Sequence, residues 1–213
     1  MTKSYDLFIS YKQHELWTSW FHDHLVTLLK TFLLNELGRE PLIFIDQELD
    51  PGETWPQRIG EALGRTSVLV PALNHSYLQS QWCLHELDLM CKRRLRHPES
   101  CVVFPLIVHN CKSLPDPISQ IQVARLERFY NPHIQRQTKD YYDFSEEVRK
   151  LAPKIANAIH TAPKIDSSWV EECITHFKHL QSERSKGRTL SLSTLDITNI
   201  SSHTTAFPSV KML

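Results

Sequence analysis

Short apolar runs separated by longer stretches of helical periodicity dominate the first three quarters of the chain. The four clearest runs cover residues 5–11, 42–46, 68–70 and 101–109. Their apolar residues are consecutive rather than alternating, which is typical of strands covered on both faces. Pro105 cannot donate to a sheet, so it should lie at an end or a bulge of the fourth strand. A weaker fifth strand is expected near Leu126 to Phe129.

Between these runs, apolar residues recur at helical spacing. The expected helices cover residues 16–37, 56–63, 80–94 and 144–159. Gly38 is placed as a C-cap of the first helix and Ser80 as an N-cap of the third. Alternating strands and helices predict a parallel sheet wound on both sides. We therefore expect an α/β, flavodoxin-like three-layer fold with five parallel strands in the order 2-1-3-4-5, followed by a C-terminal helical extension.

This strand order places a topological switch between the first and third strands, where ligands bind at the carboxyl ends. Ser10 to Lys12 follow the first strand, and Ala72 to Asn74 follow the third. Asp46 and the Pro51-Gly52 turn end the second strand and could fold over the crevice. The pattern thus predicts a pocket at this edge.

The helix beginning near Ser80 carries an apolar stripe with an acid at its margin. The stripe consists of Cys83, Leu87, Met90 and Cys91. Glu86 lies at its edge, and Trp82 lies one turn earlier on the same side. A carboxylate beside an indole at the margin of a core is partly desolvated, as acids prepared for chemistry are. A boundary glutamate facing solvent is the alternative.

Several familiar chemistries are disfavoured. The chain has only five glycines and no G-x-G-x-x-G, so neither a Rossmann cradle nor a P-loop is present. His14-Glu15 and His85-Glu86 begin like a zinc-protease motif, but each lacks its second histidine. No G-x-S-x-G elbow is found. We expect no metal and no bound cofactor.

Charge and cysteine content bear on location. Twenty-four basic and twenty-four acidic residues cancel, so no global field favours nucleic acid or an anionic membrane. No run is long enough to span a bilayer, and the first residues lack a signal-peptide core. Five scattered cysteines indicate reduced thiols, which predicts a cytoplasmic protein.

Residues 4–160 resemble the TIR (Toll/interleukin-1 receptor) domain family. The resemblance rests on four pieces in order: the run 5–11 (YDLFISY), Ile45-Asp46, Leu49-x-Pro51-Gly52 with Trp55, and Ser76-x-x-x-Ser80-x-Trp82-Cys83-x-x-Glu86-Leu87. Each piece is weak alone, and together they are specific. In enzymatic members a glutamate in a W-x-x-x-E helix cleaves NAD, and that motif falls here on Trp82 and Glu86.

The resemblance implies that Glu86 is catalytic and that NAD is a substrate rather than a cofactor. Phe8 and Ser10 would line the nicotinamide end, and Lys12 would meet a phosphate. Trp82 would stack near the ribose or only pack. Asp46 and Trp55 belong to the region that in this family closes the pocket or contacts a neighbour. Strand-core, solvated-loop and strand-end roles are the alternatives for Phe8, Lys12 and Asp46.

Cleavage would give ADP-ribose, a cyclic ADP-ribose or a conjugate, and the sequence does not choose among them. The prokaryotic members that this chain resembles serve antiviral defence, by depleting NAD or by making a nucleotide messenger. The expected partners are NAD, further copies through TIR–TIR contacts that include the Gly52 loop, and a separate effector or sensor protein. A non-catalytic TIR adaptor is the rival hypothesis.

We divide the chain into a TIR domain (1–162), a C-terminal helix (163–186) and a Ser/Thr-rich tail (187–213). Apolar residues from Trp169 to Leu180 keep helical spacing, so a helix over 168–184 should dock on the domain or on a partner. The tail is expected to be flexible and able to order on a partner, with a docked arm as the alternative.

Overall fold

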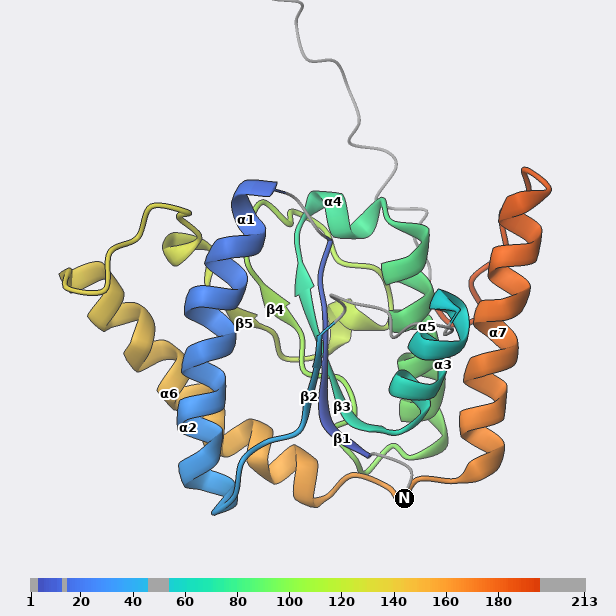
Figure 1. Cartoon of the computed structure of the whole chain (residues 1–213), viewed down its shortest axis with the longest axis horizontal. Helices are drawn as coiled ribbons and strands as arrows, with labels where there is room; N and C mark the ends of the chain where they lie inside the picture. The colour runs from blue at the N-terminus through green and yellow to red at the C-terminus, as the bar shows by residue number, and fades with distance from the viewer. Residues whose placement is uncertain (1–3, 13–14, 46–53, 196–213) are drawn as a thin grey trace, which may run out of the picture.

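A five-stranded parallel sheet forms the centre of the computed structural model, which describes residues 4–12, 15–45 and 54–195 (Figure 1). Its strands are β1 (Tyr5–Ser10), β2 (Ile43–Ile45), β3 (Thr66–Leu73), β4 (Leu106–Ile107) and β5 (Ala124–Arg125). The order is β2-β1-β3-β4-β5, and every neighbouring pair is parallel. The predicted fold class and strand order are confirmed.

Helices cover both faces of this sheet (Figure 1). One face carries a continuous helical stretch made of α1 (Glu15–Trp20), a π-helix (Phe21–Val26) and α2 (Thr27–Leu37), together with α6 (Lys139–His160). The other carries α3 (Trp55–Gly64), α5 (Gln81–Arg96) and α7 (Ser167–Ser185). Short elements complete the fold: α4 (His75–Leu78) and two 3-10 turns (Ile118–Gln120, Glu127–Phe129). No helix within the described residues is long and apolar enough to cross a membrane.

Consecutive residues of β1 feed two separate cores. Phe8 packs in the cluster between the sheet and α3, α5 and α7. Leu7 and Ile9 pack in the opposite cluster, against α2 and α6. All three side chains are completely buried. This double burial explains why Leu7, Phe8 and Ile9 are apolar at consecutive positions.

The fourth and fifth strands are shorter than the sequence suggests. Pro105 interrupts the fourth run, leaving a single bridge at Val103 and a paired strand of two residues. The fifth strand, expected near Leu126 to Phe129, is wrong in position, because β5 ends at Arg125. Leu126 and Phe129 are both buried, and their spacing of three suits the 3-10 turn that the chain forms there.

Helix α7 packs closely on α3, beyond the sheet. Cβ atoms added at Gly60 and Gly64 would lie only 2.6 Å from Ile174 Cα and 2.7 Å from Val170 Cα. The two glycines therefore let the helix backbones approach more closely than side chains would allow. The apolar face of α7 is thus buried on this domain, with Trp169, Cys173 and Phe177 among its core residues.

Residues Gly187–Leu195, here called the C-terminal strap, turn back from α7 and dock on α5. Gly187 has a positive φ of 71°, which only glycine adopts easily. The Asp88 carboxylate accepts hydrogen bonds from the backbone N–H groups of Ser193, Thr194 and Leu195 and from two hydroxyls. The described part of the expected flexible tail is therefore docked, and residues 196–213 lie outside the described part of the chain.

Candidate functional site

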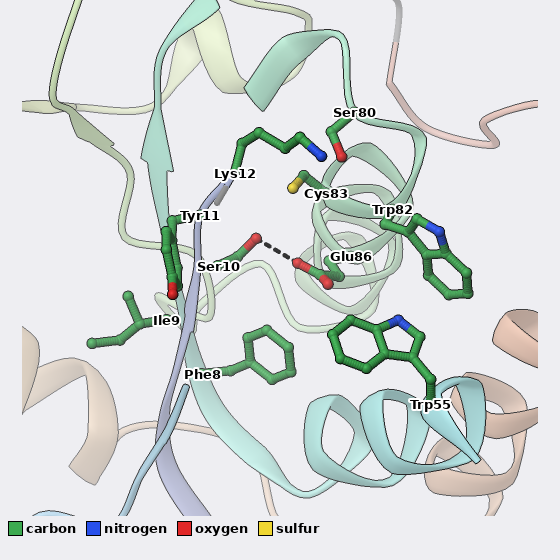
Figure 2. A pocket seen from close by; sticks show the side chains of 10 residues that line it. All are labelled: Phe8, Ile9, Ser10, Tyr11, Lys12, Trp55, Ser80, Trp82, Cys83 and Glu86. Carbon is green, nitrogen blue, oxygen red and sulfur yellow. Dashed lines mark hydrogen bonds between the residues drawn. The ribbon is translucent and has the colours of Figure 1, made fainter. Parts of the chain in front are cut away.

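The candidate site lies where β1 ends and α5 begins, on the carboxyl side of the sheet. Ser10 is the last residue of β1, and Lys12 follows it in the loop. Helix α5 starts at Gln81, so Glu86 faces the end of β1 from its second turn. Figure 2 shows the two elements facing each other across a cavity. This is the edge that the topological switch predicts.

Glu86 is held in this cavity by a short hydrogen-bonded chain. Its side chain is 5% exposed, and its Oε2 accepts a hydrogen bond from Ser10 Oγ (Figure 2). Ser10 Oγ lies 2.9 Å from the hydroxyl of Tyr77, which lies 3.1 Å from the carbonyl oxygen of Cys83. Each hydroxyl has one hydrogen, so with Ser10 donating to Glu86 the Tyr77 hydrogen is shared between Ser10 and Cys83. The chain fixes the orientation of the carboxylate.

The neighbouring thiol is not a candidate nucleophile. Burial, together with the nearby Glu86 carboxylate, raises the pKa of Cys83 to about 12, while Lys12 opposes the shift. Because the thiolate is the reactive form, a thiol that stays protonated at neutral pH is inert. Tyr77 is completely buried, and burial raises its pKa as well. Among the described groups that line this cavity, Glu86 is the only carboxylate.

Aromatic rings form the walls. Phe8 lies at the base of the cavity, with its ring 4.9 Å from that of Phe44. Trp55 and Trp82 close one side (Figure 2). Trp82 also stacks on Phe177 of α7, with ring centroids 5.6 Å apart and planes 4° apart. The indole thus both packs on α7 and presents a surface to the cavity.

The structure brings six of the seven site residues expected from the sequence into one cavity. Glu86, Phe8, Ser10, Lys12, Trp55 and Trp82 all line it. Asp46 and the Gly52 loop lie outside the described residues. Tyr77 is not predicted by the sequence pattern, because it lies on the four-residue helix α4, which is too short for a periodic signal. Its position follows from Asn74, whose side chain caps α4 at Tyr77 N.

The cavity at Glu86 is small. Its volume is about 120 Å³. Pockets that enclose whole small molecules measure roughly 300–1,000 Å³. The space beside Glu86 therefore suits one ring of a ligand, and a larger ligand must extend beyond it.

One family model and several solved structures are similar to this chain. The family model described as "TIR domain" matches residues 7–150. The TIR domain of the Toll-related Receptor TRR-2 from Hydra magnipapillata is 15% identical over 68% of this chain and 99% of its own, with a TM-score of 0.40. The TIR domains of the activated Roq1 resistosome, which directly recognizes the pathogen effector XopQ, are 20% identical over 83% of this chain and 98% of their own, with a TM-score of 0.37. A comparison with curated proteins gives no match.

Proposed function

The chain belongs to the TIR domain family, and we propose that it cleaves the bond between nicotinamide and ribose in NAD, with Glu86 as the catalytic residue. The observation that carries the proposal is the placement of Glu86. It is a carboxylate oriented by Ser10, nearly buried, yet lining a cavity of the size of one ring. A glutamate with only a packing role would not need to border an open space.

The reaction demands little beyond such a carboxylate. When the C1′–N bond breaks, both electrons leave with the nicotinamide nitrogen and neutralise its positive charge, so the leaving group needs no proton. The ribose develops oxocarbenium character, as the sugar does in glycoside hydrolysis. A fixed carboxylate stabilises that charge more in the transition state than in the ground state. One acid therefore suffices where glycosidases use two.

The surrounding residues would bind and shield the reacting ring. Phe8 and Ser10, which line the cavity, would hold the nicotinamide end, and Lys12, which also lines it, would meet a phosphate as a point charge. Trp55 and Trp82 would exclude water from the sugar. The acceptor that attacks C1′ then decides the product: water gives ADP-ribose, the substrate's own adenine gives a cyclic ADP-ribose, and a foreign nucleophile gives a conjugate.

We also infer that the enzyme works in an assembly. TIR domains self-associate, and the cavity at Glu86 holds only one ring of a dinucleotide, so the rest of the ligand lies outside it, where a neighbouring copy can also contact it. A neighbouring copy would complete the site through its Gly52 loop. All five cysteines are free thiols, which favours a reducing compartment such as the cytoplasm. A role in antiviral defence, with a separate sensor or effector protein, is the proposed context.

The experiment is a product analysis with NAD as substrate. Mass spectrometry should detect free nicotinamide together with one of the three ADP-ribose products, and activity per molecule should rise with protein concentration. The variant Glu86→Gln keeps an acceptor for Ser10 but removes the charge, so it should form no product. A protein that yields no nucleotide product at any concentration, and whose Glu86→Ala variant still binds its partners, would instead be an adaptor.

A further inference from the structure

A second cavity opens beside the one at Glu86. It measures about 600 Å³ and shares Lys12, Ser80 and Trp82 with the smaller cavity. Its far wall is formed by the end of α7 and the start of the C-terminal strap, including Arg184 and Arg188. A ligand whose ring lies at Glu86 can therefore extend into this larger space past Lys12.

Three basic side chains and no described acidic side chain line the second cavity. The basic side chains are Lys12, Arg184 and Arg188. Arg184 has no ion-pair partner among the residues that the structure describes, while Arg188 lies 3.5 Å from Glu183, which Lys186 also contacts. In a chain whose charges cancel overall, three cations around one cavity form a local field that attracts anions.

The packing of α7 and of the C-terminal strap fixes the backbone that carries both arginines. Helix α7 runs antiparallel to α5: Trp169 lies near Arg96 at the end of α5, whereas Phe177 stacks on Trp82 at its beginning. The end of α7 lies on the carboxyl side of the sheet (Figure 1), and Arg184 and Arg188 line the second cavity together with Lys12 and Ser80. The strap that follows is fixed by the hydrogen bonds to Asp88. Both arginines thus lie on an anchored segment.

We propose that Lys12, Arg184 and Arg188 form a subsite for the diphosphate of a nucleotide, so that α7 supplies substrate recognition to the catalytic domain. Guanidinium groups bind phosphate oxygens through two parallel hydrogen bonds, and Lys12 adds a third charge between the two cavities. Helix α7 lies outside the 7–150 match, so this recognition is a property of the appended segment. The identity of the ligand as NAD rests on the proposed function.

The test compares binding of ADP and of adenosine, which lacks the diphosphate, by calorimetry on the full chain. The variant Arg184→Glu should weaken ADP binding by at least about tenfold, since hydrogen bonds to charged groups are among the strongest. Its adenosine binding should not change. The control is Lys178→Glu, which makes the same charge change at an exposed position of α7 outside the cavity. Equal melting temperatures would show that each variant folds.

Nicotinamide release separates the two proposals. With NAD, Arg184→Glu should raise KM with little change in kcat, while cleavage of nicotinamide riboside, which lacks the diphosphate, should be unaffected. Binding of ADP that depends on Arg184, without any cleavage of NAD, would support the subsite and refute the enzymatic proposal. The subsite is overturned if the wild type does not bind ADP, or if Arg184→Glu binds it as tightly as the wild type does.

Discussion

Replacing Gly60 by alanine tests the close packing of α7 on α3. The wall of the cavity depends on this packing, because Phe177 of α7 stacks on Trp82. The added Cβ would lie 2.6 Å from Ile174 Cα and 2.8 Å from Ile174 N. Non-bonded carbons prefer roughly 3.5–4.0 Å, so the two helices must separate by about 1 Å. Overpacking costs about 1–3 kcal/mol, and the upper end applies here because backbone atoms cannot rotate away.

The gain in helix propensity from glycine to alanine offsets about 1 kcal/mol of that cost. The net loss in the free energy of unfolding is then about 2 kcal/mol. For a chain of this length, each kcal/mol lowers Tm by about 2–4 °C, so Gly60→Ala should melt about 4–8 °C below the wild type. Because α7 carries Phe177, which stacks on Trp82, nicotinamide release should fall as well.

The assay is calorimetric or circular-dichroism melting of the full chain. Gln57→Ala is the matched control, because Gln57 is exposed on the same helix and its substitution should change stability by no more than about 0.5 kcal/mol. A Gly60→Ala variant that melts at or above the wild-type temperature would refute the close packing of α7 on α3. Helix propensity alone would then decide the outcome.

Three further predictions concern single contacts. Ser10→Ala removes the donor that orients Glu86, so kcat for nicotinamide release should fall about 10- to 100-fold without a change of fold. Asp88→Ala should remove the hydrogen-exchange protection of the C-terminal strap. If the strap amides stay protected, the hydrogen bonds to Asp88 are not what holds the strap on α5. Burial lowers the pKa of His176 to about 4, below that of the unfolded chain, so the unfolded state takes up the proton first on acidification. Stability should therefore fall from about pH 6.5 to about pH 4, and this slope should flatten in His176→Gln.

Local patterns in the sequence were sufficient to predict the first three strands and helix α5. Runs buried on both faces and a stripe of period 3.6 are visible in the sequence, because each reports on the surroundings of consecutive residues. The expected position of Glu86 at the margin of the core followed from that stripe. The structure agrees in burying it while leaving it in contact with a cavity.

Features built from distant segments were not visible in this way. The hydrogen bonds between Asp88 and the C-terminal strap join residues more than 100 positions apart. Ser193 and Thr194 lie in a Ser/Thr-rich stretch, where nothing in the sequence indicates that they bind Asp88. Gly60 and Gly64 lie in a helical pattern, where only the contact with α7 explains them. The fifth strand was misplaced because its local pattern was ambiguous. Leu126 and Phe129, two apolar residues three positions apart, fit a strand and a 3-10 turn equally well until the neighbouring strand is known.

The most direct test of the central claim is the rate of nicotinamide release from NAD by the wild type and by Glu86→Gln, measured side by side at the same protein concentration. Removing the charge that stabilises the ribosyl cation should lower the rate by a factor of about 1,000 or more, with the melting temperature preserved. Turnover by Glu86→Gln at the wild-type rate would contradict the claim.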